Sequence, residues 1–159
     1  MKYLMTSVFV AAVLFVAFGI STTVAQESPI EALKSEIPKW NTKLSVKADL
    51  SCRGVGDTVV VGTSKDFVWI GIVYGQKDGD APIKPYINFF PVTAGEQGAL
   101  CAMPVRIQTS DHDCNNESGE LPDCQPVKGC KDFSVIDDTC DPLNFYWNTK
   151  YRAMSWWRN

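Results

Sequence analysis

Hydrophobic and polar residues alternate without a break over residues 40–52, and this pattern predicts a half-buried antiparallel strand. Because successive side chains of a strand point to opposite faces, one face of the segment is polar and the other is largely apolar. The second face carries Trp40, Thr42, Leu44, Val46, Ala48, Leu50 and Cys52. We expect this strand to cover one side of a hydrophobic core.

Four further strands are expected, three between residues 58 and 90 and one over 100–110, separated by turns rich in glycine and aspartate. The segment 67–75 is apolar on both faces, which is typical of a strand inside a sheet. Pro85 and Pro104 place their segments at sheet edges or bulges, since proline cannot donate to a strand ladder. In the tail, a period of two over 147–155 predicts one closing strand.

A short helix is expected before the first strand. Ser28, Pro29 and Glu31 match an N-cap, a first-turn proline and the glutamate of a capping box, and Pro38 ends the segment. With one short N-terminal helix and many strands, the chain is predicted to be mainly β. We expect a small antiparallel sandwich or barrel, stabilised by disulfides.

Cys52, Trp69 and Cys101 follow one another in the order that is typical of immunoglobulin domains. Ala99 stands where those domains carry a tyrosine, two residues before the second cysteine, and four cysteines follow outside the pattern. We therefore do not assign the chain to that family.

Residues 1–25 have the composition of a secretory signal peptide, with Lys2 first, then an apolar stretch, then small residues before a cleavage point expected after Ala25. The apolar stretch is shorter than the roughly 20 residues that span a bilayer, and no second stretch of that length follows. An uncleaved anchor is thus the less favoured alternative. We expect a secreted, extracellular protein whose residues 26–159 form a single β-rich domain.

All six cysteines lie in this domain, namely Cys52, Cys101, Cys114, Cys124, Cys130 and Cys140. An even number in a secreted chain predicts three disulfides. Their clustering favours a bond between Cys52 and Cys101, with the other four closing the later loop. A zinc–thiolate site is disfavoured, because the spacing contains no C-x2-C pair and the chain has one histidine.

Acidic residues gather in 111–141, a predicted cysteine-rich loop with a net charge of −7. The domain as a whole carries a charge of −4 and offers no basic field for nucleic acid. Asp111, Asp113 and Asn115 fit the first ligands of an EF-hand-like loop, but the later positions do not, so a solvated loop is favoured over a calcium site. Asn116 begins an Asn-Glu-Ser sequon in this polar loop, which predicts N-glycosylation.

His112 is the only histidine, and it precedes a cysteine that is expected to be oxidised. A serine or cysteine hydrolase needs a histidine beside its nucleophile, and ribonucleases that use a histidine pair are excluded by the count. Most acids lie on solvated loops, where spacing identifies no carboxylate pair for a glycosidase. We predict a non-enzymatic protein with no catalytic residue and no cofactor.

Aromatic residues are the remaining candidate chemistry. Trp156 and Trp157 are adjacent and face opposite sides of an extended chain, so one indole beside Arg158 suits stacking on a ligand. The predicted ligand-binding residues are Trp69, Tyr74, Phe89, Trp147, Tyr151, Trp156 and Trp157. We favour a secreted protein that binds a small hydrophobic molecule, a lipid, a glycan or an extracellular protein. The alternative is an extracellular matrix or mineral-associated protein whose acidic loop binds calcium or a cationic partner.

Overall fold

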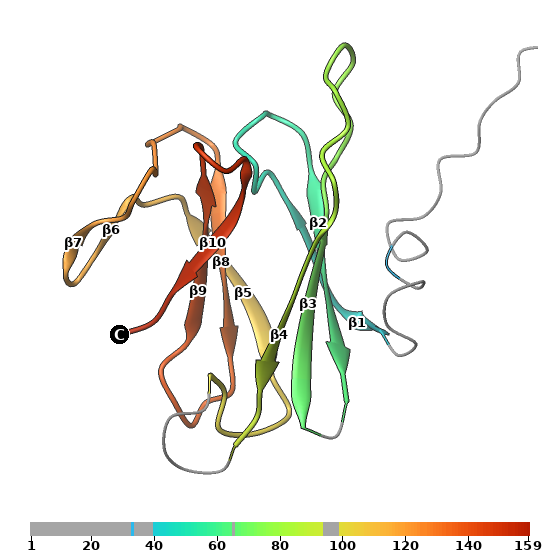
Figure 1. Ribbon diagram of the computed structural model, residues 1–159, viewed down its shortest axis with the longest axis vertical. Helices are drawn as coiled ribbons and strands as arrows, with labels where there is room; N and C mark the ends of the chain where they lie inside the picture. Colours follow the sequence, from blue (N-terminus) through green and yellow to red (C-terminus); the bar gives the residue numbers. More distant parts are fainter. Residues whose placement is uncertain (1–32, 34–39, 65, 94–98) are drawn as a thin grey trace, which may run out of the picture.

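The computed structural model of the chain describes Leu33 and residues 40–64, 66–93 and 99–159 (Figure 1). The predicted signal peptide and the predicted helix lie outside these residues, apart from Leu33, which is helical and buried. Among the described residues, no helix is long and apolar enough to cross a membrane.

One sheet consists of four antiparallel strands that follow one another along the chain (Figure 1). They are β1 (Trp40–Ala48), β2 (Asp57–Thr63), β3 (Phe67–Val73) and β4 (Tyr86–Pro91), in the order β1-β2-β3-β4. The predicted strands are confirmed here, with the apolar β3 inside the sheet, except that β1 ends at Ala48 and not at Cys52, which has a φ of 57°. β4 begins directly after Pro85 and lies at the edge, as expected for a strand next to a proline.

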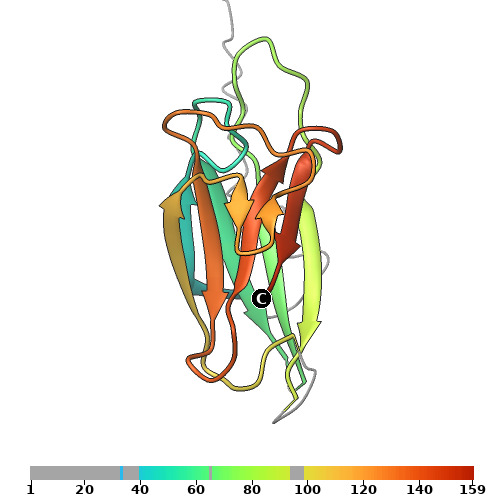
Figure 2. The ribbon, with the colours of Figure 1, turned by 90° about the vertical axis from the view of Figure 1, so that its left-hand side faces the viewer.

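The second sheet is also antiparallel and has the order β10-β9-β8-β5 (Figure 2). Its strands are β5 (Arg106–Asp111), β8 (Lys131–Ile136), β9 (Leu143–Asn148) and β10 (Ala153–Trp157). Between β5 and β8, a short hairpin of β6 (Asn115–Asn116) and β7 (Gly119–Glu120) lies on the outer side of this sheet. The mainly β prediction is confirmed, and the architecture is a two-sheet sandwich rather than a closed barrel.

The segment 111–141 is only partly the loop that its acidic composition predicted. It contains β8, in which Phe133 and Val135 are fully buried between the sheets. Two apolar residues at alternate positions are enough for a core strand when neighbouring strands supply the rest of the burial. The acidic composition of residues 111–141 as a whole predicted a loop, although the short alternation of apolar residues in β8 is a strand pattern.

The tail does not form the single closing strand predicted over 147–155. β9 ends at Asn148 and β10 begins at Ala153, and the residues between them form the turn of a hairpin. The side chain of Asn148 accepts a hydrogen bond from the backbone N–H of Tyr151 (3.0 Å), and Arg152 has a φ of 50°. Turns of hairpins use such positive φ values, which the alternation of side chains does not reveal.

The core lies between the two sheets and is built from both inner faces. Phe133 and Phe145 stack with their ring centroids 4.5 Å apart. Phe145 also meets Phe90 of the first sheet edge-on at 5.7 Å. Val68 and Ile70 of β3 are fully buried in the same cluster. The inner faces therefore pack as one continuous hydrophobic layer.

The prediction of three disulfides is confirmed, with the pairs Cys52–Cys130, Cys101–Cys140 and Cys114–Cys124. The expected bond between Cys52 and Cys101 is wrong. The backbone N–H of Lys131 donates to the carbonyl of Asp49 (2.8 Å), which places the start of β8 beside the chain leaving β1. Cys52 therefore meets Cys130 there, and the bond expected of an immunoglobulin domain is not formed.

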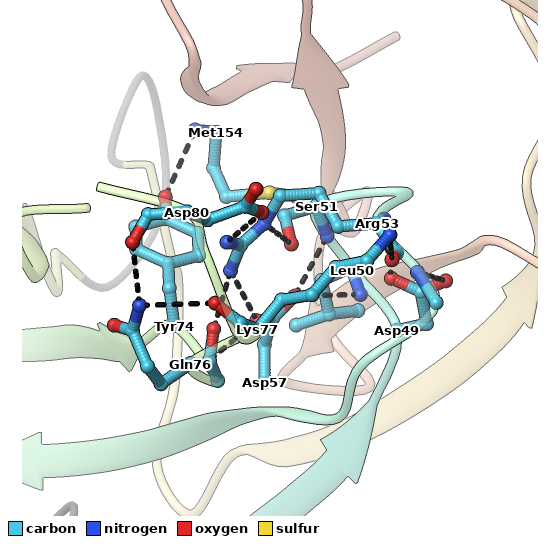
Figure 3. A network of polar contacts seen from close by, with 12 residues as sticks. Asp49, Leu50, Ser51, Arg53, Asp57, Tyr74, Gln76, Lys77, Asp80 and Met154 are labelled. Atoms are coloured by element: carbon cyan, nitrogen blue, oxygen red, sulfur yellow. Dashed lines mark hydrogen bonds and ion pairs between the residues drawn. The ribbon is translucent and has the colours of Figure 1, made fainter. Parts of the chain in front are cut away.

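A buried polar network shapes the chain between β1 and β2 (Figure 3). Asp57 is fully buried, and its Oδ2 accepts hydrogen bonds from the backbone N–H groups of Leu50 (2.9 Å) and Ser51 (2.7 Å). Its Oδ1 accepts from the N–H of Gly75 (2.8 Å). The guanidinium of Arg53 lies 3.7 Å from the same oxygen and donates to the carbonyl of Gly75 (2.6 Å). One carboxylate thus joins the loop after β1 to the end of β3.

Candidate functional site

The edge strands β4 and β10 lie beside each other along one side of the sandwich (Figure 2). A groove opens there. Its volume is about 380 Å³. The groove is lined by Asn88, Phe89, Phe90, Pro91, Ala99, Trp156 and Arg158. Because β4 and β10 are edge strands, each has a neighbouring strand on one side and solvent on the other.

Trp156 forms one side of the groove and is anchored from the inside. Met154 points into the core, and Trp156, two residues further along the strand, faces the same way. The ring of Trp156 packs edge-on against buried Phe90 at 5.3 Å, while 45% of Trp156 stays exposed. An indole held in this way is a rigid surface on which a ligand can stack.

Phe89 also lines the groove and belongs to the outer face of the first sheet. It is paired with Trp69 of β3, so both side chains lie on the same face. Its ring centroid lies 5.0 Å from that of Trp69 and 5.6 Å from that of Phe67, and 51% of Phe89 is exposed. We call Phe67, Trp69, Phe89 and Trp156 the aromatic surface. It extends over both sides of the edge strand β4.

Gly71 shapes the neighbouring part of this outer face. A Cβ at Gly71 would lie 2.6 Å from Cδ1 of Leu33 and 2.8 Å from the indole of Trp40. The indole N–H of Trp40 donates to the carbonyl of Leu33 (3.1 Å). The glycine therefore makes room for two apolar side chains that cover the sheet beside the aromatic surface.

Polar groups stand next to the rings. The side-chain N–H of Asn88 donates to the hydroxyl of Tyr86 (3.1 Å), and its oxygen accepts from the N–H of Phe89 (2.9 Å). Burial raises the pKa of Tyr86 above its ordinary value. The guanidinium of Arg158 donates to the carbonyl of Ala99 (3.3 Å). The groove thus combines apolar rings with an amide and a cation.

Asp137 fixes the segment that carries Ala99. Its carboxylate accepts from the backbone N–H groups of Cys101, Ala102, Thr139 and Cys140. Burial alone would raise the pKa of Asp137, but the four donors outweigh burial and lower it below its ordinary value. Because the folded-state pKa is the lower one, this stabilisation is present above the ordinary pKa of an aspartate and is lost as the pH falls through the folded-state value.

Three of the seven aromatic residues predicted to bind a ligand lie together on this surface, namely Trp69, Phe89 and Trp156. Tyr151 lies in the turn between β9 and β10, where 69% of it is exposed and Lys150 approaches its ring. Trp157 is half-buried and faces the side of β10 opposite to Trp156.

The two remaining predicted residues belong to the core. Tyr74 and Trp147 pack edge-on with their centroids 5.5 Å apart, and both are buried. The hydroxyl of Tyr74 accepts a hydrogen bond from the backbone N–H of Met154 (3.3 Å), and burial raises the pKa of Tyr74. This contact ties the end of β3 to the edge strand β10.

Asn88 and Ala99 were not found as site residues from the sequence. Asn88 left a signal, since it is a polar residue at an inward-facing position between Tyr86 and Phe90 of an edge strand. Ala99 left none, because it lies at the groove through long-range contacts of its neighbours, such as the hydrogen bond from the N–H of Leu100 to the carbonyl of Pro91 (3.3 Å).

The residues predicted for calcium have other partners. Asp111 forms an ion pair with Lys131, and hydrogen bonding to that ammonium lowers the pKa of Asp111. The Oδ1 of Asp113 accepts from both the backbone and the side-chain N–H of Asn115 (3.0 Å each). Calcium would have to compete with these contacts, and the calcium site stays a prediction.

No protein-family model, curated protein or solved structure matches this chain. A β-sandwich supports many unrelated functions, so the fold does not decide between them. The chemistry of the groove is therefore the basis for a function.

Proposed function

We propose that this protein is a secreted, non-enzymatic binding module that holds a glycan on its aromatic surface. The observation that carries the proposal is that two half-exposed aromatic residues, Phe89 and Trp156, both line one groove. Large aromatic side chains that gather at a concave surface, with a few polar groups beside them, are typical of ligand sites.

A sugar ring suits this surface better than a lipid does. The C–H face of a sugar packs on an aromatic ring while its hydroxyls need hydrogen-bonding groups, and Asn88 and Arg158 stand beside the rings. A lipid tail requires apolar walls on most sides. The space between the sheets is occupied by the packed core, which leaves the rim as the place for a ligand.

Replacing Trp156 or Phe89 with alanine is expected to weaken glycan binding about tenfold in each case, because each loses roughly 1.5 kcal/mol of stacking. The measurement begins with retention of the secreted protein on cellulose, chitin and β-1,3-glucan and with a glycan array. Titration calorimetry with the best oligosaccharide then gives the affinities of the variants.

The matched control is Tyr151→Ala, which removes a more exposed aromatic side chain at a position away from the groove. It is expected to bind like the wild type. Equal losses in all three variants, or no retention of the wild type on any glycan, would contradict the proposal.

We also propose that Asn116 carries an N-linked glycan. Asn116 stands at the tip of the β6–β7 hairpin, and its side-chain oxygen accepts from the N–H of Ser118 (2.8 Å). The hairpin lies on the outer side of the second sheet, away from the outer face that carries Phe89 (Figure 1). Three disulfides are compatible with an oxidising, extracellular environment, in which such sequons are modified.

For the chain secreted from eukaryotic cells, we expect a mass excess that is removed by peptide N-glycosidase. The excess should be absent from Asn116→Gln, while glycan retention through the aromatic surface should be unchanged. A wild-type mass equal to that of the unmodified chain would show that this sequon is not used.

A further inference from the structure

His112 lies against a disulfide, and only 1% of its side chain is exposed. Its Nε2 is 3.5 Å from Sγ of Cys114 and 3.4 Å from Sγ of Cys124. The sulfur atoms of Cys52 and Cys130 also lie within 4.8 Å of one of its ring nitrogens. Cysteines from distant parts of the sequence thus place their sulfur atoms around one imidazole.

These distances are those of a tetrahedral zinc site. With Zn–N of about 2.0–2.1 Å and Zn–S of about 2.3 Å, tetrahedral angles place nitrogen and sulfur roughly 3.5 Å apart and two thiolates roughly 3.8 Å apart. The nitrogen–sulfur separations of His112 already agree with this geometry. Only the two sulfurs must separate, and they do so when the bond between them is reduced.

The imidazole is also oriented as in metal sites. Its Nδ1 lies 2.7 Å from Oδ1 of Asp132, whose Oδ2 accepts from the N–H of Asp113 (3.0 Å). A carboxylate on the far nitrogen fixes the ring and directs Nε2 towards the metal position. On that side Nε2 lies 2.9 Å from the carbonyl of Gln125, a contact that a metal would replace.

The site is open to a reductant and to a fourth ligand. A pocket of about 240 Å³ borders His112, Cys114 and Cys124 and also includes Glu120. Both cysteines of this disulfide are half-buried, whereas each of the other disulfides contains a buried cysteine, Cys130 or Cys101. In this pair, a reductant can therefore approach either sulfur.

We propose that Cys114, Cys124 and His112 form a redox-gated Zn²⁺ site. A dithiol reductant transfers two electrons and two protons to the disulfide, which becomes two thiols while the reductant becomes a disulfide. Zn²⁺ then binds both sulfurs and Nε2 and releases the two thiol protons, together with any proton on Nε2. The base of the β6–β7 hairpin is closed by a covalent bond in one state and by the metal in the other.

The test starts from the folded, oxidised protein. Limited reduction with a phosphine, followed by differential alkylation and mass spectrometry, identifies the cysteines that open first. Co²⁺ is then added without oxygen, and its thiolate absorption bands and their loss on adding Zn²⁺ report the site. We expect Cys114 and Cys124 to open first and the reduced protein to bind one Co²⁺, whereas the oxidised protein gives no such bands.

Two variants separate coordination by this site from binding to stray thiols. Under the same reduction, Cys114→Ala/Cys124→Ala should give no bands, and His112→Gln should bind Zn²⁺ at least about tenfold more weakly. If another disulfide is reduced before Cys114–Cys124, the proposal that reduction of this disulfide controls Zn²⁺ binding is wrong. The absence of bands in the reduced wild type, or equal affinity in His112→Gln, overturns the site.

A further variant needs no reductant and so covers the case in which the reduced chain unfolds. Cys124→His prevents the disulfide and offers two imidazoles and the thiol of Cys114 around the same point, with the other disulfides intact. It should bind one Zn²⁺ by native mass spectrometry, and His112→Gln in that background should abolish binding. A Cys124→His protein that is folded but binds no Zn²⁺ overturns the geometric assignment.

Discussion

Replacing Asp57 with alanine is expected to lower the free energy of unfolding by about 3 to 5 kcal/mol. The carboxylate is fully buried and accepts three backbone hydrogen bonds, from Leu50, Ser51 and Gly75. Without it these N–H groups lose their acceptor, and the guanidinium of Arg53 loses a buried counter-charge at 3.7 Å. Urea denaturation, followed by tryptophan fluorescence and circular dichroism, measures the change.

The matched control is Asp80→Ala. Asp80 faces the same guanidinium at 3.5 Å, but its side chain is 40% exposed, and surface ion pairs contribute less than about 1 kcal/mol. A large difference between the two variants shows that the buried contacts of Asp57, rather than an exposed ion pair with Arg53, carry the stability. Equal effects would contradict this account.

Removing the disulfide between Cys52 and Cys130 with two alanines is expected to cost about 4 to 5 kcal/mol. The bond closes a loop with a sequence separation of 78, and loop closure of that length restricts the unfolded chain by roughly this amount. It also joins the loop after β1 in the first sheet to the start of β8 in the second, so the two sheets lose a covalent link. Denaturation in urea under oxidising conditions gives the value.

Cys114→Ala/Cys124→Ala provides the comparison, since it removes the same atoms from a loop with a separation of 10. Its expected cost is about 2.5 to 3 kcal/mol, and the difference of roughly 2 kcal/mol between the variants reflects loop length. If the shorter loop costs as much as the longer one, loop entropy is not the main source of the stability.

Much of the first sheet could be predicted from local pattern. Alternation over residues 40–48 and the apolar run of β3 reflect burial on one face or on both, which is a property of the strand itself. The edge position of β4 followed from Pro85, because the missing donor excludes proline from the middle of a sheet. The number of disulfides followed from the even cysteine count.

The strands of the second sheet were harder to predict from the sequence. β8 has two buried apolar residues in an acidic segment, and the turn between β9 and β10 keeps the period of a strand. The burial of β8 and the position of this turn both depend on which strands pair with these segments in the folded sheet. The aromatic residues show the same limit, because Tyr74 and Trp147 are core while Phe89 and Trp156 are half-exposed, although their local sequences are equally apolar.

By itself, the sequence determined that the chain is a disulfide-bonded, mainly β protein, and it supplied the positions of the strands of the first sheet. These properties depend on neighbours along the chain, through side-chain alternation, proline chemistry and cysteine number. Only the tertiary structure decided which cysteines pair, which rings form the aromatic surface, and that His112 meets the sulfurs of Cys114 and Cys124. Those features depend on contacts between edges and loops that are distant in sequence, and packing of the two sheets brings them together.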